Sequence, residues 1–139
     1  MKKIILFIII LSIGFTANPR YGDKQIRSML KEYFVAENNA PDLLGIRIFK
    51  GKKGKVFQID IESTLSSKKN DIILSFRALA RVGSYAKIPF RKFIVVCHLP
   101  GNLVPSVAES QANCAIKYFI RGKITEQKWR QDCLIERKL

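Results

Sequence analysis

Residues 46–62, IRIFKGKKGKVFQIDIE, have the pattern of a β-hairpin. Apolar and polar side chains alternate on both sides of a glycine-bounded tip, which is typical of two half-buried antiparallel strands. Only one register places the apolar side chains on one face, because a shift by one residue would mix the two faces. Its pairs are Ile48 with Phe57, Ile46 with Ile59 and, beside the tip, Lys50 with Lys55.

An amphipathic helix is predicted on each side of this hairpin. The first begins at Asp23, carries apolar residues at spacings of three and four, and ends at the turn formed by residues 38–41. The second is capped by a serine at residues 66–67. Its apolar stripe turns Arg77 and Arg81 away from the core.

The C-terminal half predicts one strand and two helices. Residues 91–98 are apolar at consecutive positions, which indicates a strand in the centre of the sheet. Residues 106–109 have the Ser-x-x-Glu form of a capping box, so a helix is expected from there toward Gly122. Thr125 caps a final short helix. Residues 117–124 fit either the end of the longer helix or a further strand.

The predicted order is helix, strand, strand, helix, strand, helix, helix. This order indicates a small α+β two-layer sandwich with helices packed on one face of a mixed sheet. The sheet has three strands, or four if residues 117–124 form a strand. A chain of 139 residues has room for a single core, so one domain is expected.

The N-terminal segment, residues 1–17, has the three parts of a bacterial secretory signal: two lysines, an apolar run of about ten residues, and small residues at its end. We expect cleavage after Ala17. Cleavage after Gly14, and retention of residues 4–17 as a membrane anchor, are the alternatives. The remaining residues 18–139 then form one domain exported to the periplasm or secreted.

The cysteine and histidine counts restrict the chemistry. An exported domain with three cysteines leaves one unpaired. Cys97 lies inside the predicted central strand, so the disulfide is predicted between Cys114 and Cys133, with the other two pairings or no disulfide as the alternatives. The single histidine excludes a metal site with two histidine ligands, and no Cys-x-x-Cys pair is present. We therefore predict neither a metal nor another cofactor.

Basic residues are the most prominent surface feature. The formal net charge is +14, and +12 without the two lysines of residues 1–17. Crowded like charges are mildly unfavourable, and a bound anion relieves them. The predicted ligand-binding residues are Lys50, Lys52, Lys53, Lys55, Arg77 and Arg81, joined in sequence by Lys68, Lys69, Lys87, Arg91 and Lys92. A purely solubilising surface is the alternative interpretation.

Three further residues are weak catalytic candidates. His98, the only histidine, stands at the end of a predicted buried strand and is a candidate acid or base. Asp60 and Glu62 follow Asp42 in a pattern that resembles part of the carboxylate motif of PD-(D/E)xK nucleases. Glu62 occupies the position where that motif has its lysine, so its most specific element is missing. A solvated strand face explains both acids by alternation alone.

Three functions are compatible with these observations. The first is an exported basic binding module that meets an anionic surface: lipid headgroups, a cell-wall polymer or nucleic acid. The second is a small exported nucleic-acid hydrolase that uses His98 with one carboxylate. The third is an envelope protein that keeps its N-terminal segment as an anchor and serves a protein complex. No motif of high specificity chooses between binding and catalysis.

Overall fold

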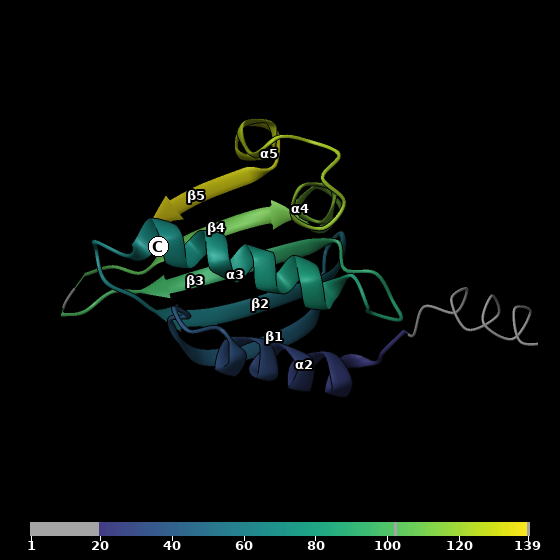
Figure 1. Cartoon of the computed structure of the whole chain (residues 1–139), viewed down its shortest axis with the longest axis horizontal. Helices are drawn as coiled ribbons and strands as arrows, with labels where there is room; N and C mark the ends of the chain where they lie inside the picture. The colour runs from purple at the N-terminus through teal and green to yellow at the C-terminus, as the bar shows by residue number, and fades with distance from the viewer. Residues whose placement is uncertain (1–19, 102, 139) are drawn as a thin grey trace, which may run out of the picture.

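The computed structural model describes residues 20–101 and 103–138, and in this part of the chain the fold is α+β (Figure 1). The predicted signal segment, residues 1–17, lies outside it. The elements are α2 (Asp23–Ala36), β1 (Asp42–Gly51), β2 (Gly54–Glu62), α3 (Lys68–Gly83), β3 (Lys92–His98), β4 (Ser106–Gln111), α4 (Ala112–Phe119), α5 (Glu126–Asp132) and β5 (Leu134–Lys138). No helix in these residues is both long enough and apolar enough to span a bilayer.

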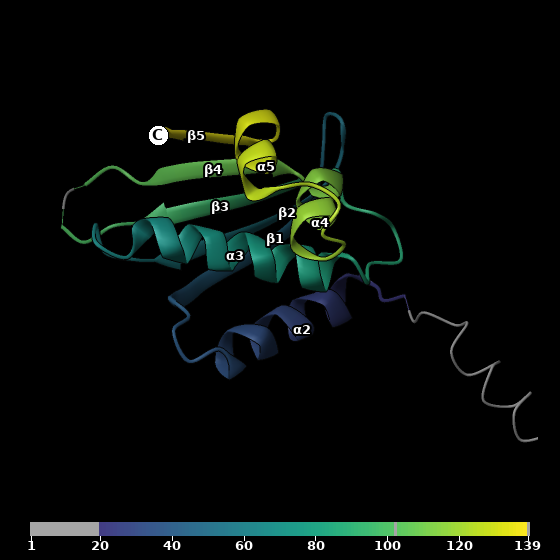
Figure 2. The same cartoon turned by 45° about the horizontal axis from the view of Figure 1, so that its top comes forward.

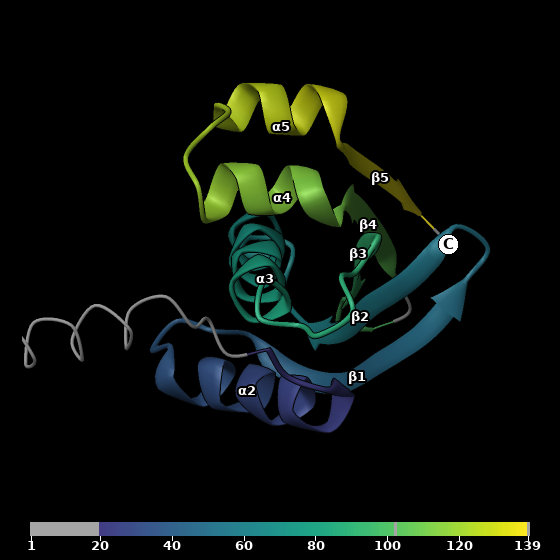
Figure 3. The ribbon, with the colours of Figure 1, turned by 90° about the vertical axis from the view of Figure 1, so that its right-hand side faces the viewer.

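The five strands form one mixed sheet in chain order, β1-β2-β3-β4-β5. β2 and β3 pair in parallel, because α3 carries the chain back across the sheet, and the other neighbours are antiparallel. The helices gather on one face, α2 over β1, α3 over the middle, and α4 and α5 beside β4 and β5 (Figure 2). The other face carries no helix (Figure 3).

The hairpin register predicted from alternation is confirmed. Ile48 pairs with Phe57, and Lys50 pairs with Lys55 beside the tip. Gly54 is required at the tip for two reasons: its φ is +139°, and a Cβ there would lie 3.0 Å from the Cβ of Arg91. The predicted central strand is also confirmed as β3, the third of five.

The prediction of a helix from Ser106 is wrong over its first turns. Ser106–Gln111 is strand β4, and α4 begins only at Ala112. Pairing with β3 overrides the local capping-box pattern, because β4 buries Ala108 and Ser110 toward the helices as part of the sheet. The strand alternative for residues 117–124 is also wrong, since α4 continues to Phe119 and a turn follows.

The predicted sheet of three or four strands is too small. Two strands escaped prediction: β4, which was expected to be helical, and β5, which pairs antiparallel with β4 at the edge of the sheet. β5 has no alternating pattern, because Leu134 is partly buried and the next four residues are exposed. The observed order is therefore helix, strand, strand, helix, strand, strand, helix, helix, strand, although the α+β class is as predicted.

The core lies between the sheet and the helices, and a disulfide closes one end of it. Phe57, Phe76, Phe93 and Trp129 are among its fully buried side chains. Cys114 in α4 is bonded to Cys133, the residue that follows α5. Both helices and the start of β5 are thereby linked covalently beside Trp129.

We expect alkylation to modify none of the cysteines in the folded, unreduced protein. Burial raises the pKa of the Cys97 thiol, because desolvation disfavours the thiolate that reacts. Unfolding without a reductant should therefore add one iodoacetamide group to the intact mass, and unfolding with a reductant should add three. Three groups without a reductant would contradict the disulfide, and one group in the folded protein would contradict the burial of Cys97.

Candidate functional site

The start of the described chain, the hairpin tip and the start of β3 meet at one end of the sheet, the right-hand end of Figure 1. Tyr21 exchanges backbone hydrogen bonds with the loop after α3, accepting from Lys87 N–H at 2.8 Å. The Lys55 carbonyl accepts from Arg91 N–H at 2.7 Å. Arg20 donates from Nη1 to the Ser84 carbonyl at 2.8 Å. These bonds hold segments far apart in sequence beside one another.

Cations predominate at this end, which we call the basic end. It comprises Arg20, Lys50, Lys52, Lys53, Lys55, Arg81, Lys87, Arg91 and Arg121. Two acids accompany them: Asp23 forms an ion pair with Lys55, and Asp132 lies beside the hairpin tip. The remaining cations of the basic end form no ion pair with any described residue.

Of the six predicted ligand-binding residues, the structure brings five to the basic end. The four hairpin lysines lie there together, and Arg81 is in the last turn of α3. Lys55 is tied to Asp23, and its ammonium lies 5.2 Å from the Phe90 ring centre. Lys52 and Lys53 are exposed at the tip itself and are the members most accessible to an anion.

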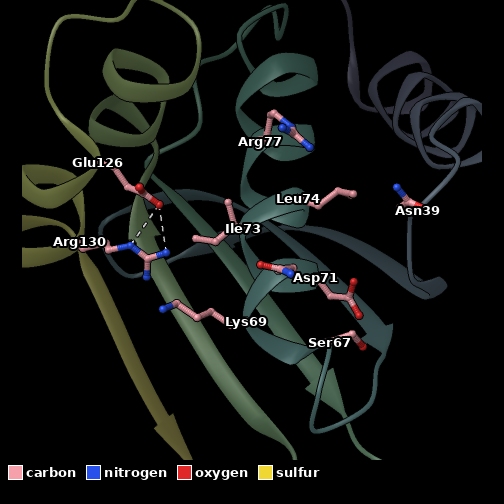
Figure 4. Close-up of a pocket in the computed structure, with 10 residues that line it drawn as sticks. Asn39, Ser67, Lys69, Asp71, Ile73, Leu74, Arg77, Glu126 and Arg130 are labelled. Carbon is pink, nitrogen blue, oxygen red and sulfur yellow. Dashed lines mark hydrogen bonds and ion pairs between the residues drawn. The ribbon is translucent and has the colours of Figure 1, made fainter.

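The sixth residue, Arg77, lies elsewhere and pairs with Glu37 at 3.8 Å. It borders a hollow of about 690 Å³ around the exposed side of α3 (Figure 4). Most charged groups of this hollow already have partners: Arg130 donates to Glu126 at 3.1 Å, and Asp71 accepts from Ser63 Oγ at 2.5 Å. In Figure 4 Arg77 lies farther along α3 than Lys69 and Asp71, apart from both. We therefore assign no site to the hollow.

Sequence reasoning missed Arg20 and Arg121 as members of the basic end. Arg20 is brought there by the pairing of Tyr21 with the loop after α3, and Arg121 follows α4. Both placements depend on contacts between distant segments, for which the sequence carries no local signal. Lys87 and Arg91 were noted as basic neighbours in sequence. The bond to Tyr21 places Lys87 next to Arg20, and the bond to the Lys55 carbonyl places Arg91 beside the hairpin tip.

The three weak catalytic candidates gather at the opposite end of the sheet. His98 Nε2 lies 2.9 Å from the Asp60 carboxylate, and Glu62 is the strand partner of His98 across β2 and β3. Asp42 pairs with Glu62 in turn. The parallel pairing of β2 with β3 creates this cluster, because it places the carboxyl ends of both strands at the same edge.

The two clusters are well separated along the strands. β2 is nine residues long, so at about 3.3 Å per residue its two ends are roughly 26 Å apart. The carboxylates of Asp42, Asp60 and Glu62 lie at the end of the strands that carries His98, whereas the hairpin lysines lie at the other end. Among the described residues, no three acidic, histidine or cysteine side chains form a group that could hold a metal ion.

No protein-family model matches the chain, and no curated protein or solved structure matches it.

Proposed function

We propose that this protein is a binding module of the cell envelope that docks its basic end on an anionic membrane surface. The observation that carries the proposal is the convergence at one end of the sheet of cations from distant segments, most of which form no ion pair with a described residue. Cations gathered in this way attract that end of the domain to an anionic surface. Each Lys or Arg near an anionic bilayer contributes about 1 kcal/mol.

The position of the N-terminal apolar run supports a lipid surface over the other anionic partners. Its last residue, Ile13, is seven residues before Arg20, which belongs to the basic end. Seven extended residues span at most about 25 Å. In a chain that keeps the run in a membrane, the basic end is therefore held close to the headgroups. In a chain cut after Ala17, the same cations bind without the tether.

The experiment that tests the proposal is a titration with lipid vesicles. Protein purified from cells that express the full chain is first weighed by intact mass, which shows whether residues 1–17 remain. It is then mixed with vesicles of phosphatidylcholine alone, or with phosphatidylglycerol added. We expect binding only to the anionic vesicles if the segment is cleaved, and stronger binding to them if it is kept. In both cases the preference should weaken as salt is raised, because salt screens exposed charges.

Equal binding to neutral and anionic vesicles would overturn the proposal. Single-stranded RNA serves as a competing anion in the same assay, and its length is checked afterwards. Tighter binding to RNA than to anionic vesicles would indicate that the partner of the basic end is nucleic acid and not a lipid surface. If the RNA is shortened, and this cleavage is lost in the His98→Ala variant, the protein is a nucleic-acid hydrolase and not a binding module.

A further inference from the structure

A groove runs across the helix-free face of the sheet next to the basic end. It has a volume of about 490 Å³, within the range of roughly 300–1,000 Å³ typical of small-molecule sites. The hairpin tip forms one wall, and β5 with the end of α5 forms the other. Figure 3, which views the molecule from this end, shows the hairpin reaching away from the helices on the side where β5 also lies.

The floor of the groove is mainly aliphatic. Phe49 and Val56 face each other across β1 and β2, while Ile94 and Ile135 flank Glu109 on the neighbouring strands. Ile135 is 59% exposed although it is a large apolar side chain. An alkyl chain laid on this floor would remove exposed apolar surface from water, which favours binding.

The cations of the groove are unequally available. Glu109 is held by Lys92 at 3.3 Å and by Arg137 at 2.6 Å, so these three charges largely satisfy one another. Lys52, Lys53 and Arg91 also line the groove, and no carboxylate of the described chain pairs with them. The exposed Asp132 is the other acid in the lining. The free positive charge is therefore at the hairpin wall.

The aromatic content argues against nucleic acid as the ligand of the groove. Its one aromatic ring is Phe49, and the Arg47 guanidinium already lies 5.0 Å from the centre of that ring. Single-stranded nucleic acids bind by stacking successive bases on accessible aromatic rings. An aliphatic floor with free cations at one wall instead complements a ligand with an anionic head and an alkyl chain.

We infer that this groove binds a single-chain anionic amphiphile, with the head group at Lys52, Lys53 and Arg91 and the chain along Ile94 and Ile135. The inference goes beyond membrane docking: the groove shares Lys52, Lys53 and Arg91 with the basic end, but binding in it does not require that end to rest on a bilayer. The ligand class is an alkyl phosphate or a long-chain carboxylate, which present the same chemistry to the groove.

Calorimetric titration with octyl and decyl phosphate, below the concentrations at which they form micelles, tests the inference. Affinity should rise by up to about fourfold for each added methylene, since each buried methylene contributes about 0.8 kcal/mol. Octyl glucoside, which has the same chain and no charge, should bind at least about tenfold more weakly, because it forms no charge-assisted hydrogen bonds. Equal affinity for the charged and neutral heads, or no dependence on chain length, would overturn the inference.

A matched pair of variants locates the site. Ile135→Asp places a carboxylate on the groove floor, whereas Ile88→Asp makes the same change at an isoleucine outside the groove. The two side chains are 59% and 61% exposed, so neither change disturbs the core. We expect Ile135→Asp to weaken decyl phosphate binding at least tenfold and Ile88→Asp to leave it unchanged. Equal effects of the two variants would show that decyl phosphate does not bind in the groove.

The membrane-docking proposal and the groove proposal can be refuted independently, because vesicle binding and amphiphile binding are measured separately. If Ile135→Asp abolishes decyl phosphate binding while the protein still docks on anionic vesicles, both the groove and the proposed function stand. If the wild-type protein binds decyl phosphate but shows no preference for anionic vesicles, the groove stands and the membrane-docking function falls. If the protein docks on vesicles and binds no alkyl phosphate, the groove inference alone is overturned.

Discussion

Reversing two charges at the hairpin tip, by Lys52→Glu and Lys53→Glu together, should lower the affinity for anionic vesicles by about a thousandfold. Each lysine near an anionic bilayer contributes about 1 kcal/mol, and a glutamate in its place is repelled to a similar extent. Each substitution changes the charge by two units, so the four units together amount to about 4 kcal/mol, which is roughly a thousandfold in affinity. Co-sedimentation with phosphatidylglycerol vesicles at about 0.1 M salt measures this change.

The control for this variant is Lys68→Glu with Lys69→Glu. These lysines are also adjacent, and they lie in the first turn of α3, at the end of the sheet opposite the basic end. Both double variants change the net charge of the chain equally, and both keep the core intact because none of the four lysines is buried. Only the location of the changed charges differs between them.

We expect the control variant to lose no more than about threefold in affinity, because charges beyond the screening length of about 10 Å at moderate salt contribute little. If the two variants lose affinity equally, net charge rather than the basic end controls binding. If neither loses affinity, the hairpin tip does not contact the membrane. Circular dichroism of both variants verifies that the fold is retained.

The hairpin was predictable from sequence to the level of individual residue pairs. Its side-chain period is two, and a one-residue slip would have exposed the apolar side chains, so the local pattern allows one register only. Strand β3 was predictable for a related reason, since consecutive burial marks a central strand. The four hairpin lysines of the basic end therefore followed from local pattern alone.

Strands β4 and β5 were not predictable in this way. The sequence of β4 also satisfies a helix start, and only its pairing with β3 decides between the two structures. β5 is exposed along most of its length, so its sequence resembles that of a surface loop. In both cases the deciding interaction is a backbone pairing between distant segments, which a local pattern does not record.

The same limit applies to the functional clusters. The contact of His98 with Asp60 depends on the parallel pairing of β2 and β3, which joins residues 38 positions apart. The sequence marked both residues as weak catalytic candidates, but nothing in the local pattern placed them in contact. The arrival of Arg20 beside the end of α3 likewise depends on one bridge, between Tyr21 and Ala86.

Truncating Trp129 to alanine should reduce the free energy of unfolding by about 3–5 kcal/mol. Trp129 is fully buried, and its ring contacts Phe76, Tyr118 and Phe119 with centroids 5.5, 5.6 and 5.0 Å away. Its Nε1 donates to Ser110 Oγ at 3.0 Å. The side chain thus joins α5 to α3, α4 and β4, and its loss leaves a large cavity between these elements.

Trp129→Phe separates the two parts of this effect. Phenylalanine keeps most of the buried aromatic contacts but removes the bond to Ser110, which retains its own bond to the Gln111 carbonyl at 3.0 Å. We therefore expect a smaller loss, of about 1–2 kcal/mol. Urea unfolding of both variants with the disulfide intact measures the difference.

An alanine variant within about 1 kcal/mol of wild type would contradict the burial of Trp129, since large-to-small core changes rarely cost so little. A small domain has only about 5–15 kcal/mol of stability, so the loss in the alanine variant should shift its unfolding transition clearly. The shape of that transition should then show whether α5 unfolds together with the core or apart from it. One cooperative transition at lower urea places α5 in the same folding unit. A separate early transition, followed by unfolding at the wild-type midpoint, would show that α5 and β5 unfold apart from the core and are held to it by the Cys114–Cys133 bond. The wall of the groove that β5 forms would then depend on that disulfide.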